Sequence, residues 1–171
     1  VLKRLVIPHE VIVIDDASKD DTSEVIEQYL RRLSASKRRM VKFIRHKKNL
    51  TPTPTFNEGM AMAKGDYFIC LPAVDWFATT MLEEESAILD AHIHVGVVYS
   101  QAITIEDGKG RLVVAEPAGM KTVIGREEFA RLLTMGDFVA LPTAMFRRAL
   151  VESFGSWDPQ LRFHADHEFW I

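Results

Sequence analysis

The chain has 171 residues, of which 47% are hydrophobic and 26% charged, and 21 Lys and Arg against 24 Asp and Glu give a formal net charge of −3. These proportions are typical of a globular domain and exclude a disordered or collagen-like chain. The near balance of charges gives no general attraction for nucleic acid, which we do not expect as a partner. The single cysteine, Cys70, cannot close a disulfide within the chain, and this favours a reducing, cytoplasmic location. No apolar run approaches the roughly 20 residues that span a bilayer, and the first residues lack the pattern of a signal peptide.

The first part of the chain has the pattern of a parallel β–α–β unit. Residues 11–14 are a short, apolar, β-branched run, as in a strand buried on both faces. A helix follows, because Asp21 and Glu24 have the spacing of an N-terminal capping pair and apolar residues then recur on one helical face. Residues 34–36 end this helix, and residues 41–45 read as the next strand. A strand, a helix and a strand at this spacing predict a parallel pair.

The later part of the chain predicts further helices and an antiparallel hairpin. The sequence Asp-Gly-Lys-Gly at residues 107–110 is a hairpin turn signal, so the later sheet is expected to be mixed. The elements expected in this part are helices over 57–64 (entered from the proline-rich stretch 51–55), 82–91 and 126–134, and strands over 67–71, 96–105, 112–115 and 143–147. Together with the first part, they predict one α/β domain.

Two adjacent carboxylates follow the first strand. In an open parallel sheet, ligands bind beyond the carboxyl ends of the strands, which is where Asp15 and Asp16 stand. Carboxylates there can accept hydrogen bonds from a ribose hydroxyl or a base N–H, or hold a cation. Capping of the next helix is the alternative role. Because one cap needs only one carboxylate, the pair favours a ligand site.

Short motifs occur in order along most of the chain. They are EVIVIDDASKDDT (residues 10–22), RHKKN (45–49), FNEG with AKGDY (56–59 and 63–67), FRR (146–148), GSWD (155–158) and ADHEFW (165–170). In this order they resemble the motifs of glycosyltransferase family 2, an inverting family with the GT-A fold. The resemblance extends from about residue 5 to residue 171.

The resemblance implies a fold and a domain organisation. The fold is GT-A, a Rossmann-like mixed α/β sheet flanked by helices, in a single domain of residues 1–171. Residues 1–95 would be its nucleotide-binding half and residues 96–171 its acceptor-side half. Residues 1–8 resemble only the end of the helix that follows the family's first strand, so we expect the chain to be part of a longer domain.

The resemblance also implies a reaction and its residues. A sugar would pass from a nucleotide-diphospho-sugar, such as a UDP- or GDP-sugar, to an acceptor hydroxyl on a saccharide, a lipid-linked molecule or a protein, as in polysaccharide or cell-wall biosynthesis. By position in the motifs, Asp15, Asp16, Ser18 and Asn57 would bind the nucleotide sugar. Asp166 would be the base that takes the proton of the attacking hydroxyl. Capping of the last helix is the alternative role for Asp166.

The sequence departs from the family after the expected strand 67–71. Relatives there have an Asp-any-Asp element that holds a divalent metal, Mn²⁺ or Mg²⁺, against the diphosphate. This chain has Pro72 and Val74 in those places, and neither side chain can bind a cation. Asp75, the next residue, is the candidate metal ligand that is left, and Lys47 or Lys48 could supply positive charge instead.

Four other interpretations stay open. Loss of the two acids favours a GT-A-like binding or assembly module without catalysis. The acidic end of the first strand also resembles a phosphoacceptor receiver domain, although Pro72 stands about where such a domain needs its phosphorylated Asp. The basic residues between 37 and 48 suit either a solvated strand edge or an anionic membrane surface, which would place the protein at the cytoplasmic face of a membrane. A metal at His164, His167 and Glu168 is the weaker reading of that segment.

Overall fold

The computed structural model describes residues 9–106, 109–113, 123–136, 138–161 and 163–171. The chain divides into two compact units, of which the first is Val1–Gly65 with Ser156–Ala165 and the second is Asp66–Gly155 with Asp166–Ile171. The first division along the chain therefore falls after residue 65, whereas the sequence suggested halves that meet at residue 95. The single domain of residues 1–171 stays a prediction, and the expectation for residues 1–8 lies outside the described residues.

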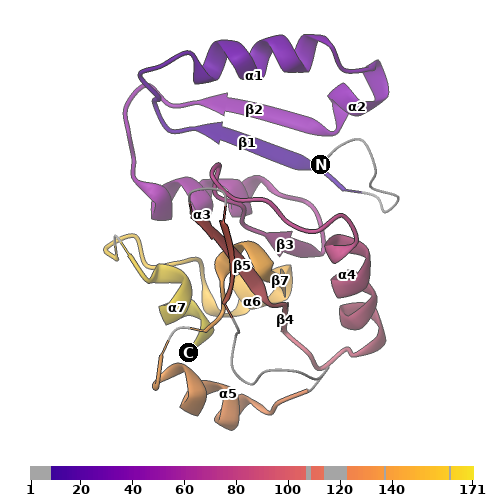
Figure 1. The fold of residues 1–171 in the computed structure, drawn as a ribbon, viewed down its shortest axis with the longest axis vertical. Coiled ribbons are helices and arrows are strands. Elements are labelled where there is room, and N and C mark those ends of the chain that lie inside the picture. The colour runs from indigo at the N-terminus through magenta and orange to yellow at the C-terminus, as the bar shows by residue number, and fades with distance from the viewer. Residues whose placement is uncertain (1–8, 107–108, 114–122, 137, 162) are drawn as a thin grey trace. The chain divides into compact units, whose positions relative to one another are not determined.

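The first unit contains a parallel strand pair. Strand β1 (Val11–Asp15) pairs with β2 (Val41–Arg45) in parallel, and helices α1 (Thr22–Arg31) and α2 (Ala35–Arg39) connect them. Helix α3 (Pro52–Met62) follows β2, and α1 and α3 lie on opposite sides of the pair (Figure 1). The predicted β–α–β unit is confirmed.

The prediction that Asp21 caps α1 through its side chain is wrong. Asp21 precedes the helix but its side chain makes no capping hydrogen bond. Asp20 does this work instead, because its carboxylate accepts hydrogen bonds from the backbone N–H of Thr22 at 3.1 Å and from the Thr22 hydroxyl at 2.6 Å. Ser34, expected to end the helix, begins α2, where its hydroxyl accepts from the N–H of Lys37 at 3.4 Å. Serine is a favoured residue at the N-cap of a helix, which is the position of Ser34 in α2.

Helix α3 begins earlier than the sequence suggested. The helix was expected from residue 57, after a stretch broken by prolines, but its first residue is Pro52. Proline suits the first turn of a helix, because its backbone angle is already helical and the N–H that it lacks would have no partner there. The residue before it, Thr51, has a φ of 75°, a left-handed conformation that is strained for a β-branched residue.

The second unit is built on an antiparallel sheet. Its strands have the order β3-β7-β4, and β7 is antiparallel to both neighbours. The strands are β3 (Tyr67–Ile69), β4 (Val97–Tyr99) and β7 (Ala144–Arg147), and the unit's helices are α4 (Met81–Ala91), α5 (Arg126–Leu133), the 3₁₀ turn η1 (Leu141–Thr143), α6 (Arg148–Phe154) and α7 (Ala165–Trp170).

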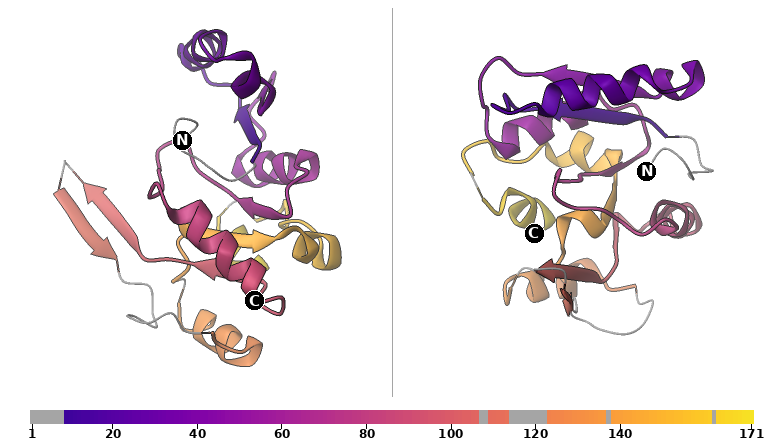
Figure 2. Two further views of the ribbon diagram at one scale, coloured as in Figure 1. Left: turned by 90° about the vertical axis from the view of Figure 1, so that its right-hand side faces the viewer. Right: turned by 45° about the horizontal axis from the view of Figure 1, so that its top comes forward.

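The predicted hairpin is confirmed as a pair of antiparallel strands. Strand β5 (Ala102–Glu106) pairs with β6 (Lys109–Val113), and the pair projects from the rest of the second unit (Figure 2). Residues 107–108 of the turn, and residues 114–115 of the strand expected over 112–115, lie outside the described residues. The single strand expected over 96–105 is two strands in different sheets. The N–H of Ser100 still bonds to the carbonyl of Thr143 at 3.2 Å, after which the chain leaves the sheet.

The core of the second unit centres on Phe146 of β7. This side chain has no exposed surface, and its ring lies 5.6 Å from that of Phe68, 5.8 Å from that of Phe169 and 5.4 Å from that of Trp170, all edge to face. Edge-to-face contacts are favoured by the charge distribution of aromatic rings. The last helix of the chain is thereby packed against the strand that the FRR motif forms.

Arg147, the next residue of that motif, joins β7 to the end of α4. Its guanidinium donates to the backbone carbonyls of Val95 at 2.7 Å, Leu89 at 2.5 Å and His92 at 3.2 Å. It also lies over the ring of Tyr67, 5.4 Å from the ring centre. A cation at the C-terminal end of a helix satisfies carbonyls that have no partner within the helix. Arg147 therefore has a structural role in this unit.

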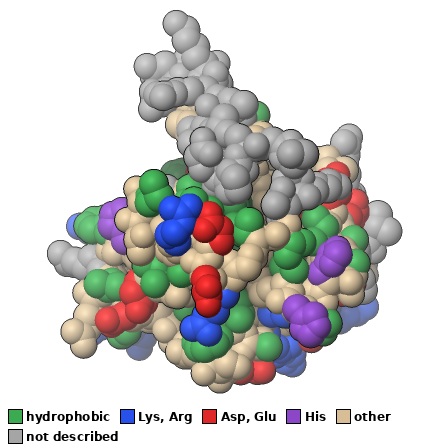
Figure 3. Space-filling model, turned by 90° about the horizontal axis from the view of Figure 1, so that it is seen from below, with side chains coloured by type: hydrophobic (Ala, Val, Ile, Leu, Met, Phe, Trp, Pro, Cys, Tyr) green, Lys and Arg blue, Asp and Glu red, His purple; other side chains and the backbone are tan. Residues whose placement is uncertain are grey.

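The surface is mixed in character. On the face shown in Figure 3, apolar side chains lie among acidic, basic and histidine side chains. Exposed apolar residues include Val74, Trp76, Ile93 and Met135, and single residues of this kind are ordinary on a protein surface. Within the described ranges, no helix has the length and apolar character needed to cross a membrane.

Candidate functional site

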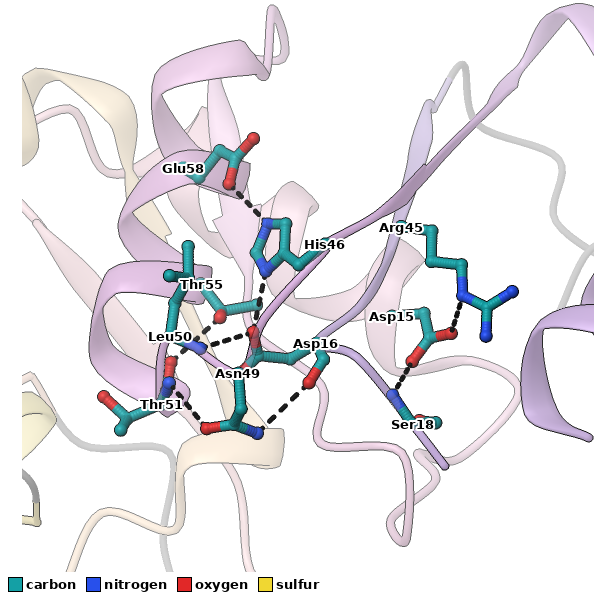
Figure 4. A network of polar contacts seen from close by, with 10 residues as sticks. All are labelled: Asp15, Asp16, Ser18, Arg45, His46, Asn49, Leu50, Thr51, Thr55 and Glu58. Carbon is teal, nitrogen blue, oxygen red and sulfur yellow. Dashed lines mark hydrogen bonds and ion pairs between the residues drawn. The ribbon is translucent and has the colours of Figure 1, made fainter. Parts of the chain in front are cut away.

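The carboxyl end of β1 is joined to the loop that follows β2. In the parallel register, Asp15 lies opposite Arg45, and the backbone carbonyl of Asp15 accepts from the N–H of His46 at 2.9 Å. The loops after both strands therefore meet, as expected at the carboxyl edge of a parallel sheet. Figure 4 shows the polar contacts that result.

Asp15 is enclosed by partners from its own loop and helix. Its side chain has no exposed surface, and its carboxylate accepts from the N–H of Ser18 at 2.9 Å and from the hydroxyl of Ser23. The guanidinium of Arg45 lies 3.6 Å away. Hydrogen bonds from Ser18 and Ser23 hold the pKa of Asp15 below its usual value, against the opposing effect of burial. Asp15 thus shapes the loop in which Ala17 adopts a φ of 62°.

Asp16 points to the other side of the loop. Its Oδ1 lies 2.7 Å from Nδ1 of His46 and accepts from the N–H of Leu50 at 2.8 Å, and its backbone carbonyl accepts from the amide of Asn49 at 3.1 Å. Burial alone would raise the pKa of Asp16, but the hydrogen bonds from His46 and Leu50 outweigh it, and the pKa is lowered. The side chain keeps 19% of its surface exposed, so this ionised carboxylate can still reach a ligand.

His46 connects Asp16 to α3. Its Nε2 lies 2.7 Å from a carboxylate oxygen of Glu58, while only 8% of the His46 side chain is exposed. The hydrogen bond to Asp16 is the main cause that raises the pKa of His46, and Glu58 adds to it. We name these three residues the Asp16–His46–Glu58 cluster. His46 and Glu58 lie within the RHKKN and FNEG motifs, but the sequence alone assigns neither residue a role.

The remaining residues expected in the nucleotide site have structural partners. The N–H of Ser18 bonds to Asp15. The side-chain amide of Asn57, on α3, donates to the backbone carbonyl of Trp157 at 2.7 Å and accepts from its N–H at 3.1 Å. Both amide atoms of Asn57 are therefore engaged within the first unit, and its contact with a nucleotide stays a prediction.

The segment that would hold a metal lies in the second unit. The N–H of Asp75 bonds to the carbonyl of Pro72 at 3.0 Å in an exposed turn, and Val74 is 83% exposed. One carboxylate with an apolar neighbour is a poor donor set for Mn²⁺ or Mg²⁺, which take several oxygen ligands. Among the described residues, no three His, Cys, Asp or Glu side chains are grouped as metal ligands. The residues present do not fit such an ion.

Asp166 also lies in the second unit. It is the second residue of α7 and is half-buried, so it is within the first turn rather than at the capping position. Negative charge is favoured at this end of a helix. The next residue, His167, bonds through Nε2 to the carbonyl of Leu133 at the end of α5, at 3.0 Å. The structure thus brings Asp15, Asp16 and Ser18 together in the first unit and places Asp75 and Asp166 in the second.

The fold matches those of solved glycosyltransferases. TarS of S. aureus (1-349) superposes with a TM-score of 0.69 at 21% identity, over 98% of this chain and 47% of that chain. A mannosyltransferase from Pyrobaculum calidifontis, PcManGT, in complex with GDP-Man and Mn²⁺, superposes with a TM-score of 0.60 at 17% identity, over 94% of this chain and 42% of that chain. The protein has the GT-A fold, as predicted.

The sequence comparison gives the family. The family model described as glycosyl transferase family 2 matches residues 1–155, and the chain belongs to that family. EpsE of Bacillus subtilis (strain 168), assigned as a glycosyltransferase, is 30% identical over 98 residues, which are 57% of this chain. The chain spans 34% of the length of EpsE and less than half of the matched TarS and PcManGT chains. Membership of this family replaces the receiver-domain interpretation.

Proposed function

We propose that the protein transfers a sugar from a nucleotide-diphospho-sugar, a UDP- or GDP-sugar, to an acceptor hydroxyl with inversion. The observation that carries this proposal is the acid pair at the carboxyl end of β1 in a chain of glycosyltransferase family 2. The PcManGT structure supports a nucleotide-sugar donor, because it holds GDP-Man in the same fold. The acceptor would be a saccharide, a lipid-linked molecule or a protein, in polysaccharide or cell-wall biosynthesis.

The two acids divide the work of donor binding. Asp16 is ionised and partly exposed, so it can accept a hydrogen bond from an N–H of the base. Asp15 is fully buried and bonded to Ser18 and Ser23, so it holds the loop in the shape that presents Asp16 and Ser18. Asn57 would contribute through the segment that its amide holds.

Asp166 would act on the acceptor. Its carboxylate would take the proton of the acceptor hydroxyl while that oxygen forms a bond to the anomeric carbon. The bond from this carbon to the donor's diphosphate breaks at the same time, and the diphosphate leaves with the bonding electrons. Attack from the face opposite the leaving group gives inversion.

No metal step is included in this mechanism. The segment Pro72 to Asp75 does not fit a divalent cation, so we expect nucleotide affinity to be the same with Mn²⁺ and with a chelator. Asp75→Asn checks whether that carboxylate takes part. A cation stabilises a leaving diphosphate by several kcal/mol, so the departure at Pro72 and Val74 also supports a second candidate, a module that binds nucleotide sugars without transfer.

Calorimetry with UDP, GDP and their sugars, with Mn²⁺ or a chelator, tests the proposal. We expect one nucleotide to bind and Asp16→Asn to weaken its affinity by about tenfold, a loss of about 1.4 kcal/mol. Asp21→Asn is the matched control, since this exposed acid of the same loop makes no capping bond. If the unaltered protein binds no nucleotide in either condition, the proposal fails. Turnover of any nucleotide sugar decides against the non-catalytic module.

A cytoplasmic location, with or without contact with a membrane surface, is part of the same proposal. The lone Cys70 is buried and free, which suits a reducing compartment. Co-sedimentation with anionic vesicles would detect attachment through the basic residues between 37 and 48.

A further inference from the structure

The His46 ring presents both of its nitrogens to carboxylates. Nδ1 lies 2.7 Å from Asp16, and Nε2 lies 2.7 Å from Glu58. An ionised carboxylate only accepts hydrogen bonds, and a neutral imidazole has a proton on one nitrogen alone. Both contacts are therefore hydrogen bonds only if the cluster holds one proton more than a neutral ring supplies. The pKa of Asp16 is lowered and that of His46 is raised, so the extra proton belongs on the ring.

We propose that His46 is a positioning residue of the nucleotide site, which in its protonated form fixes Asp16 for contact with the base of the donor. The inference rests on the donor-binding role proposed above for Asp16. It adds that donor affinity depends on the protonation of a residue that does not itself touch the donor.

The geometry explains why loss of one proton would matter. Oδ1 of Asp16 is held from two directions, by the His46 ring and by the N–H of Leu50, and Leu50 precedes the strained Thr51. Once the ring is neutral, one carboxylate faces a lone pair. Glu58, with 38% of its side chain exposed, can turn into water, which leaves the ring held on one side only.

Charge acts in the same direction. The cluster has one positive and two negative groups when the ring is protonated, and two negative groups when it is not. A diphosphate donor is anionic, so it is repelled more strongly by the second state. The titratable groups that face the ring are Asp16, from the loop after β1, and Glu58, from α3. Arg45, the residue before His46, is directed instead to Asp15 at 3.6 Å and Glu24 at 3.9 Å.

The test is the affinity for UDP and for GDP, measured by calorimetry between about pH 5.5 and about pH 8.5, the range in which histidine titrates. The affinity of the unaltered protein for its nucleotide should fall by at least roughly 5-fold as the pH rises past the pKa of His46. His46→Gln should bind weakly at all of these values, with a flat profile. Glu58→Gln removes one anionic partner of the ring, so the decline should move to lower pH.

His94→Gln is the matched control, because this exposed histidine in the second unit should leave the profile unchanged. Nitrogen NMR of the His46 ring adds a readout without nucleotide, in which both nitrogens should be protonated near neutral pH. A neutral ring there, or equal affinity of the unaltered protein and His46→Gln at every pH, overturns the inference and leaves the proposed function standing. If the unaltered protein binds no nucleotide at any pH, both fall.

Discussion

Asn57 and Trp157 are 100 residues apart in the sequence and are joined by two hydrogen bonds. The amide of Asn57 donates to the Trp157 carbonyl at 2.7 Å and accepts from the Trp157 N–H at 3.1 Å. The ring of Trp157 is buried and lies 5.3 Å from the ring of Phe56, the neighbour of Asn57 on α3. One turn earlier, the hydroxyl of Thr53 donates to the carbonyl of Leu161 at 2.8 Å. The segment Ser156–Ala165 is thus fastened to α3 at two points.

Asn57→Ala is expected to destabilise the protein by about 2 kcal/mol, since it leaves both polar groups of the Trp157 backbone without the amide that pairs them. Chemical denaturation followed by tryptophan fluorescence measures this change. Gln28→Ala, which removes an exposed amide from α1, should stay within about 0.5 kcal/mol of the unaltered protein. Equal stability of the two variants would contradict the fastening role.

Arg147→Met is expected to cost roughly 3 kcal/mol, because three backbone carbonyls, at the end of α4 and in the segment that follows it, lose a charged donor. The control is Arg148→Met on the following residue. Its ion pairs, with Asp66 at 3.8 Å and Glu152 at 3.9 Å, have largely exposed acidic partners, so its loss should cost at most about 1 kcal/mol. A larger effect of Arg148→Met would show that the motif acts through the second arginine instead.

Glu85 should make stability depend on pH. Burial raises the pKa of this α4 carboxyl to about 8. The nearby Ser100 hydroxyl opposes this rise only in part, because neither carboxyl oxygen of Glu85 has a hydrogen-bond partner among the described residues. Both states hold the proton below the usual value of 4.5, so Glu85 has no effect there. Between 4.5 and about 8 the unfolded chain loses the proton and the folded chain keeps it, so stability falls as pH rises.

Glu85→Gln is expected to remove this fall, so its stability relative to the unaltered protein should rise by up to about 1.4 kcal/mol per pH unit across that interval. Denaturation midpoints at about pH 5, 6, 7 and 8 measure the difference. Glu127→Gln, which removes an exposed carboxylate from α5, should run parallel to the unaltered protein. Parallel curves for Glu85→Gln would mean that the carboxyl is ionised in the folded state.

Asp166→Asn should lower the rate of sugar transfer by about 10²- to 10⁴-fold, the usual contribution of a general base. The affinity for the nucleotide should stay nearly unchanged. Initial rates with the nucleotide sugar selected by calorimetry, together with a titration of the nucleotide, separate these two effects. Glu168→Gln on the same helix turn is the control and should keep its rate. Full activity of Asp166→Asn would assign the base to another residue.

The fold was largely predictable where local pattern decides it. The β-branched run at residues 11–14 and the apolar strand at 41–45 gave the parallel pair, and the Asp-Gly turn gave the hairpin. The start of α3 differs from the expected residue 57, because Pro52 at the first position of a helix favours the helix rather than breaking it. The break between β4 and β5 was missed because an apolar run does not reveal the sheet to which each half belongs.

The site was predictable only in part, for a physical reason. The position of Asp15 and Asp16 after a strand follows from local pattern, but their difference in exposure depends on partners elsewhere in the chain. His46 reaches Asp16 only through the register of the strand pair, and reaches Glu58 only because α3 lies beside β1. Such contacts are set by packing rather than by spacing. The one signal in the sequence was the position of His46 directly after the predicted strand 41–45, at the same edge of the sheet as Asp15 and Asp16.

The path of the chain between the two units has a practical consequence. The chain passes from one unit to the other after residues 65, 155 and 165, so neither unit is a continuous stretch of sequence. A protein cut at residue 65, or ended at residue 155 where the family model stops, would lose the segment that α3 holds. A single proteolytic nick therefore cannot release either unit whole. A chimera that takes its first unit from a relative must take the segment Ser156–Ala165 together with Val1–Gly65.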